Sequence, residues 1–152
     1  MTTLLLDTNI PSESIRSRPD PKVDAWIHQQ DDETLHLSVV TIGELRKGLD
    51  LAPQGKRRSE LEEWLEKDLI PTFDGRILPV TQVIAERWGA LSAERQLVGR
   101  PLSMADGLIA ATALEHGLTL VTRNVKDFDL LGITILNPWD ETPSADRPTP
   151  KF

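Results

Sequence analysis

The sequence predicts an α/β fold, a three-layer α/β/α sandwich around a mostly parallel central sheet. Two observations support this prediction. Short apolar runs of strand length alternate with longer segments whose apolar residues recur at helical spacing. Proline, glycine and capping residues fall where these segments meet. Alternation of this kind is typical of helices packed on both faces of a parallel sheet.

The first third of the chain predicts two strands and two helices. A leucine-rich run at residues 3–7 forms the first strand and ends at Asp7. A helix follows Asp20, because a proline stands at its first position. A second strand is expected over residues 35–40 and a helix over 41–51, which Pro and Gly then end.

The middle of the chain predicts an edge strand between two helices. Apolar residues at helical spacing mark a helix over 61–69, and Pro71 is expected to stop it. The short run 77–80 contains a proline, which confines it to a sheet edge. The next helix covers residues 84–98.

The last third predicts a capped helix and two strands. Residues 103–116 form an alanine-rich helix that Gly117 closes as a C′ glycine. Strands are expected over 118–122 and 133–136. From residue 140 to 152 proline, threonine and charge dominate, which predicts a disordered tail after a single domain over residues 1–139.

Composition excludes several classes of protein. There are no cysteines, which rules out disulfides, thiolate metal sites and a cysteine nucleophile. No apolar run reaches the roughly 20 residues of a membrane helix, and the start does not resemble a signal peptide, so we expect a cytoplasmic location. The net charge of -7 is unlike that of a typical nucleic-acid binder. An RNA substrate would therefore require local basic residues or bound cations.

Acidic side chains follow several of the predicted strands. Asp7 ends the first strand, and Glu44 lies in the first turn expected after the second. Asp106 lies in the first turn of helix 103–116, and Asn124 and Asp127 follow strand 118–122. In an open parallel sheet all these positions meet at the carboxyl edge, where sites form. The sequence therefore predicts a cluster of carboxylates there.

Such a cluster requires a proton or a cation. Two carboxylates about 4 Å apart repel by ~4 kcal/mol at an effective dielectric of 20. Oxygen ligands suit Mg²⁺ or Mn²⁺, which also bind phosphates and activate water in phosphodiester cleavage. A structural role stays open for each acid, because Thr41 with Glu44 and Ser103 with Asp106 match helix-capping patterns. Asp7 also suits an ordinary turn.

Five motifs occur across residues 3–139. They are LLDTN at residues 5–9, TIGELRKG at 41–48, PLSMADGLIAATA at 101–113, LVTRNVKDF at 120–128 and NPW at 137–139. In sequence and in order these motifs closely resemble those of PIN-domain proteins, above all the VapC toxins of bacterial toxin–antitoxin pairs, including the FitB-like branch.

The resemblance implies an Mg²⁺- or Mn²⁺-dependent endoribonuclease that acts on tRNA or rRNA as the toxin of a type II pair. A small VapB-like antitoxin would inhibit it, in a homodimer or higher assembly. Asp7, Glu44 and Asp106 match the metal ligands, and Thr8 and Asn9 match supporting groups that are also candidates for substrate binding.

One motif departs from the family pattern. Asn124 stands where family members often have an acid, and Asp127 is the alternative source of a fourth carboxylate. We expect Asn124 to orient a metal-bound water and Asp127 to contribute less than the three principal acids. Both are candidate catalytic residues, and the number of metal ions stays open.

Basic residues near the acidic motifs are candidates for phosphate contacts. Arg46 and Arg123 are the preferred pair because they lie nearest to these motifs, and Arg95 and Arg100 are further candidates. The absence of tyrosine argues against extensive base stacking.

Three other functions fit part of the pattern. A catalytically weak PIN-like module would bind only RNA or a partner, and a related nuclease would cut DNA. A receiver-like phosphoacceptor fits less well, because no acidic pair precedes Asp7 and Lys126 lies beyond the strand end. Metal-dependent cleavage of RNA, compared with DNA of equal sequence, separates these alternatives.

Overall fold

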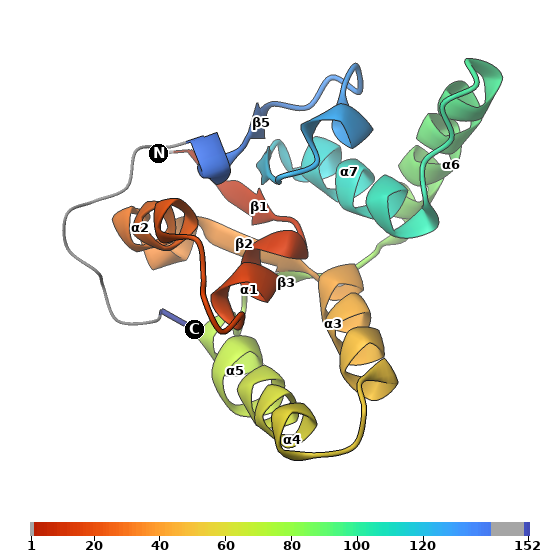
Figure 1. Cartoon of the computed structure of the whole chain (residues 1–152). Coiled ribbons are helices and arrows are strands. Elements are labelled where there is room, and N and C mark those ends of the chain that lie inside the picture. The colour runs from red at the N-terminus through yellow and green to blue at the C-terminus, as the bar shows by residue number, and fades with distance from the viewer. Residues whose placement is uncertain (1, 141–150) are drawn as a thin grey trace.

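The protein forms a five-stranded parallel sheet with helices on both faces, and the three-layer α/β/α prediction is confirmed (Figure 1). The computed structural model describes residues 2–140 and 151–152. The strand order is β3-β2-β1-β4-β5, and every neighbouring pair is parallel. The strands are β1 (Leu4–Leu6), β2 (Leu35–Ser38), β3 (Ile77–Leu78), β4 (Thr119–Val121) and β5 (Ile135–Leu136).

Four helices, α2, α3, α6 and α7, fall close to the positions that the sequence predicts, whereas α1 was not predicted and the helix predicted over 61–69 begins at Lys56. The α-helices are α1 (Asn9–Ser14), α2 (Pro21–Gln29), α3 (Val39–Leu51), α4 (Lys56–Glu63), α5 (Ile70–Thr72), α6 (Gln82–Leu97) and α7 (Met104–His116). Short 3₁₀ turns are η1 (Asp32–Thr34), η3 (Val125–Phe128) and η4 (Pro138–Asp140), and η2 (Trp64–Leu69) is a π-helix. No helix in the part of the chain that the structure describes is long and apolar enough to span a membrane.

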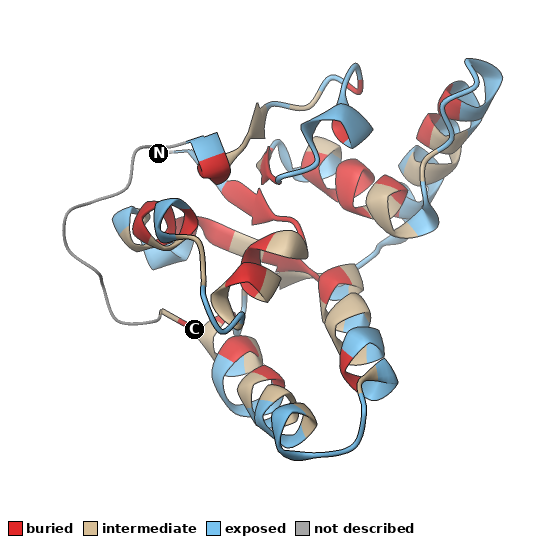
Figure 2. Ribbon diagram, in the orientation of Figure 1, coloured by how far each residue is buried: buried red, intermediate tan, exposed pale blue. Residues whose placement is uncertain are grey.

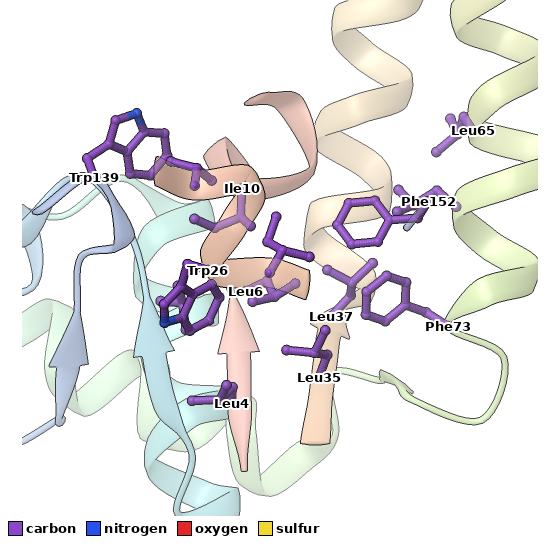
Figure 3. Packing of buried hydrophobic residues seen from close by; sticks show 14 of the residues in the cluster. Leu4, Leu6, Ile10, Trp26, Leu35, Leu37, Leu65, Phe73, Trp139 and Phe152 are labelled. Atoms are coloured by element: carbon purple, nitrogen blue, oxygen red, sulfur yellow. The ribbon is translucent and has the colours of Figure 1, made fainter. Parts of the chain in front are cut away.

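Alternate side chains of β1, a strand that is buried along its whole length (Figure 2), divide the core into two layers. Leu4 and Leu6 face one side of the sheet, where α1, α2, α3 and the α4–α5 segment cover them (Figure 3). Leu5 faces the opposite side, where it packs with residues of α6 and α7. Successive side chains of a strand point to opposite faces, so this fully buried strand is leucine throughout.

The layer formed by α6 and α7 is held at a close approach. Gly107 of α7 faces Trp88 of α6, and a Cβ at position 107 would lie 2.7 Å from Trp88 Cδ1. Real Cβ atoms do not approach other atoms this closely, so the contact requires glycine. The same glycine follows Asp106, and the packing of α6 on α7 therefore sets where that acid lies.

The helix expected to stop at Pro71 includes the proline and ends one residue later, at Thr72. α4 continues into the π-turn η2 and then into α5, which contains Pro71. In the π-turn the N–H of Ile70 donates to the carbonyl of Leu65, five residues back. The wider turn relieves the clash between a proline ring and the carbonyl four residues earlier, which is the usual reason a helix stops at proline.

The last two residues differ from the tail predicted over residues 140–152. Most of that range, residues 141–150, lies outside the described residues. Lys151 donates to the carbonyls of Ile27 and Gln30 at 3.0 and 2.8 Å, at the carboxyl end of α2. Phe152 is buried and meets Phe73 edge to face at 5.5 Å between ring centroids (Figure 3). The helix dipole favours a cation at this end of α2, which explains the position of Lys151.

The order of the strands also locates a topological switch point. From β1 the chain adds β2 and β3 on one side, and later β4 and β5 on the other. The direction of winding reverses between β1 and β4, and in open α/β sheets ligands bind outside the carboxyl ends of the strands at this point.

Candidate active site

Asp7 lies where β1 ends, at the switch point between β1 and β4. Its carboxylate accepts hydrogen bonds from the Thr8 N–H at 2.8 Å, the Thr122 hydroxyl at 2.8 Å and the Asn9 side-chain amide at 3.4 Å. Asp7 is 3% exposed, and this burial raises its pKa from 3.8 to about 6. The bonds from Thr122 and Thr8 oppose that rise in pKa, and the charges of Asp106 and Glu44 add to it.

Glu44 lies one turn further into its helix than the sequence predicts. Ser38 is the N-cap of α3, because its hydroxyl accepts from the Val40 N–H at 3.0 Å, so the helix begins at Val39. The prediction that Glu44 occupies the first turn is therefore wrong, and so is a capping box with Thr41. The Glu44 carboxylate instead accepts from the Thr8 hydroxyl at 2.5 Å. Thr8 thus connects the carboxylates of Asp7 and Glu44.

Asp106 lies in the first turn of α7, as predicted. The Ser103 hydroxyl accepts from the Asp106 N–H at 3.1 Å and caps the helix. Partial burial raises the pKa of the Asp106 carboxyl, and the charges of Glu44 and Asp127 raise it further, while the Ser103 hydroxyl lowers it. The capping interpretation therefore accounts for the backbone of Asp106, and its carboxylate belongs to the same acidic cluster as Asp7.

The two candidates for a fourth position lie differently. Asn124 is exposed and donates its backbone N–H to the Thr122 hydroxyl at 3.0 Å. Asp127 lies in η3, and it is near enough to raise the pKa of Asp106. Of the two, Asp127 is the one whose charge acts on the acidic cluster.

Arg46 and Arg123, the preferred candidates for phosphate contacts, are each engaged by different neighbours. Arg46 bonds to Asp50, Glu62 and Glu66 at 3.2 to 3.4 Å. Arg46 lies two residues after Glu44 in α3. Each residue of a helix turns the chain by about 100°, so the two side chains point about 200° apart and leave α3 on opposite faces. Arg123 lies with its guanidinium 5.2 Å from the centre of the Trp139 ring.

Sequence reasoning missed Thr122, a buried residue that binds Asp7. Its hydroxyl donates to the Asp7 carboxylate and accepts from the Asn124 N–H and the Asn9 side chain. A polar residue at the end of an otherwise apolar strand was the available signal, since a buried hydroxyl requires a partner. The hydroxyl of Thr41, also fully buried, lies 3.1 Å from the Thr8 hydroxyl, which accepts from it while donating its own proton to Glu44.

The cluster has the chemistry of a divalent cation site. Over residues 2–140 and 151–152, Asp7, Glu44 and Asp106 form no ion pair, and the buried Asn9 Oδ1 has no hydrogen-bond partner. The donors are all oxygen, which suits hard cations such as Mg²⁺. In the described residues no three acidic or histidine side chains converge as a ready-made metal site. A cation would therefore have to draw the carboxylates closer together.

The raised pKa of Asp7 makes the stability of the metal-free protein depend on pH. Between about pH 4 and 6 the folded protein keeps a proton on Asp7 that the unfolded chain has lost, so stability falls as pH rises through this range. The expected contribution is about 3 kcal/mol. Urea unfolding in chelator from pH 4.5 to 7.5 measures it, and Asp7→Asn should flatten the curve. An unchanged slope in that variant would contradict this origin.

The chain is similar to known proteins in both sequence and structure. The sequence matches the PIN domain family over residues 4–132. It is 42% identical over 137 residues to the VapC ribonuclease Y4jK of Sinorhizobium fredii, covering 90% of this chain and 98% of that protein. It is 38% identical to the toxin FitB of Neisseria gonorrhoeae, over 91% of this chain and 99% of FitB. The crystal structure of FitAcB from Neisseria gonorrhoeae superposes with a TM-score of 0.85 and 38% identity, covering 91% of this chain and 99% of that one.

Proposed function

Because this chain belongs to the PIN domain family, we propose that it is a metal-dependent endoribonuclease whose Asp7, Glu44 and Asp106 bind a divalent cation, Mg²⁺ or Mn²⁺. One observation carries this assignment of the site. The pKa of Asp7 is raised by burial and by the charges of Asp106 and Glu44, three acids from separate parts of the chain. Asp7 and the Thr122 hydroxyl that binds it lie at the carboxyl ends of β1 and β4, where ligands bind in open sheets.

The residues of the chain prepare the site in three ways. Three donors fix the Asp7 carboxylate, and the Thr8 hydroxyl orients Glu44. At neutral pH Asp7 is mostly ionised, since its pKa is about 6, and its charge is then available to a cation. A bound divalent cation supplies an activated water and stabilises the leaving oxygen in phosphodiester cleavage.

We assign the fourth position to Asp127 rather than Asn124, because Asp127 raises the pKa of Asp106. Arg123 lies two residues beyond the end of β4 and is exposed, which supports a phosphate contact there. Arg46 is assigned no such contact, because three carboxylates already engage it. Thr8 and Asn9 support the carboxylates, and we do not assign them to the substrate.

The activity is tested with RNA and DNA of equal sequence. We expect the purified protein to cleave single-stranded RNA in Mg²⁺ or Mn²⁺, to leave the DNA intact, and to lose activity in chelator. Asp7→Asn protein prepared in parallel controls for contaminating nucleases. Cleavage of DNA alone would indicate the related DNA nuclease. Failure to cleave either polymer, with RNA still bound, would indicate the catalytically weak module.

We further propose that the protein is the toxin of a toxin–antitoxin pair, with tRNA or rRNA as its target. Its similarity to FitB and to the protein in the FitAcB structure supports this role. A VapB-like antitoxin would then suppress cleavage in the same RNA assay, in a homodimer or higher assembly. The cytoplasmic location and the domain boundary at residue 139 stay predictions from the sequence.

A further inference from the structure

Arg95, near the end of α6, is a buried cation that no ion pair explains. It is 7% exposed, and its guanidinium donates to three backbone carbonyls. The distances are 2.8 Å to Arg100, 3.0 Å to Asp129 and 3.4 Å to Asp127. Burial excludes the phosphate contact that the sequence suggested for it. Within residues 2–140 and 151–152 it forms no salt bridge.

The three carbonyls come from two loops. Asp127 and Asp129 belong to η3 and its end, and Arg100 belongs to the loop between α6 and α7. The Arg100 guanidinium also donates to the carbonyl of Lys126 at 3.2 Å. Arg95 and Arg100 thus connect the carboxyl end of α6 to the backbone of η3 through hydrogen bonds to its carbonyls.

The backbone just beyond η3 is strained, which indicates that the segment is held in place. Leu130 has a φ of 63° and is 85% exposed. A left-handed conformation costs a residue other than glycine roughly 1 to 2 kcal/mol, and burial of the Leu130 side chain does not offset that cost. The hydrogen bond from Arg95 to Asp129, directly before Leu130, fixes the chain where this strain arises.

We propose that Arg95 is a positioning residue that holds Asp127 against Asp106 and so sets the affinity of the carboxylate cluster for a divalent cation. The inference rests on the proposed function of that cluster. Arg95 binds the carbonyl of Asp127 itself, so movement of the guanidinium moves the residue that bears the carboxylate. Arg100, whose carbonyl Arg95 also binds, lies in the loop that leads into α7, and Phe128 of η3 packs in the same apolar cluster as Ile109 of α7. The turn that bears Asp127 therefore lies against the helix whose first turn holds Asp106. The direction in which the charge of Asp127 moves the pKa of Asp106, upward, agrees with this placement.

Arg76 provides a matched control, because it makes the same kind of contact elsewhere. Its guanidinium donates to the backbone carbonyls of Asp32, Leu35 and Thr72, the second of them at 2.7 Å. It also lies over the Phe73 ring. These contacts join η1, β2 and α5, and none of them involves the acidic cluster. Arg76→Met should therefore cost stability without changing cation binding.

The test measures Mn²⁺ binding by the paramagnetic resonance signal of free Mn²⁺, with thermal unfolding and RNA cleavage measured alongside. We expect Arg95→Met to weaken Mn²⁺ binding about tenfold, the lower end of what loss of an outer-shell partner costs. Arg95→Lys should recover part of that loss, because its ammonium reaches fewer of the three carbonyls. In an Asp127→Asn background, Arg95→Met should weaken Mn²⁺ binding no further.

Two results would overturn the proposal. One is wild-type Mn²⁺ affinity in Arg95→Met and Arg95→Lys, and the other is a further tenfold loss in the Asp127→Asn background. If Arg95→Met fails to fold, Arg95→Lys with and without Asp127→Asn gives the same comparison. A wild-type protein that neither binds Mn²⁺ nor cleaves RNA would refute the proposed function itself, and this inference with it.

Discussion

Asp106→Asn is expected to lower RNA cleavage by about a hundredfold or more while leaving the fold intact. A bound cation contributes several kcal/mol to phosphodiester cleavage, and each 1.36 kcal/mol is tenfold in rate. An asparagine keeps the backbone N–H that the Ser103 hydroxyl caps, so the start of α7 is preserved. It also removes the repulsion with Glu44 and Asp127, and we expect the metal-free protein to unfold at the same or a higher temperature.

The measurement is single-turnover cleavage over a range of Mg²⁺ concentrations, with thermal unfolding in chelator. Glu115→Gln is the matched control, because Glu115 is another acid of α7 whose carboxylate pairs with Arg87 and not with the cluster. It should cleave RNA at the wild-type rate. Full activity in Asp106→Asn would remove Asp106 from the site.

Gly107→Ala is expected to destabilise the protein by about 1 to 3 kcal/mol, the usual cost of an overpacked contact. The new Cβ would lie 2.7 Å from Trp88 Cδ1 and 2.8 Å from its Nε1, and both atoms belong to a bulky ring held between α6 and α7. For a chain of this length 1 kcal/mol lowers the unfolding temperature by about 2 to 4 °C. Cleavage should also fall, because Asp106 is carried on the displaced helix.

Gly89→Ala distinguishes this contact from a general effect of alanine. Gly89 also lies in a helix, α6, and a Cβ there would meet nothing within 4 Å. Alanine is the better helix former by up to about 1 kcal/mol, so Gly89→Ala should stabilise the protein. Equal destabilisation by both substitutions in calorimetry would show that close packing at Trp88 is not the cause.

The sequence predicts the elements whose local signals agree with their tertiary setting. Three leucines that end in an acid predict β1 and Asp7, and Ser103 with Gly117 marks both ends of α7. The start of α3 was misplaced because Val39 and Val40 are β-branched and extend the apparent strand. Once Ser38 caps the helix, those two valines begin it.

Other features depend on contacts that no local pattern records. Passage through Pro71 requires a π-turn, in which the bonding partner lies five residues back. The Thr122 hydroxyl binds Asp7, which lies 115 positions away in the sequence. The burial of Arg95 depends on carbonyls of two loops. Each needs a partner that only the folded chain brings close.

The edges of the sheet limit how copies of this protein could associate. β3 and β5 are the outermost strands, and each is two residues long. Pro79 directly follows β3 and Pro138 comes shortly after β5, and proline offers no N–H to an incoming strand. Neither edge presents a ladder on which a second sheet could grow. In the part of the chain that the structure describes, the sheet edges therefore disfavour pairing of strands between copies, which leaves helical and loop surfaces for contacts between subunits.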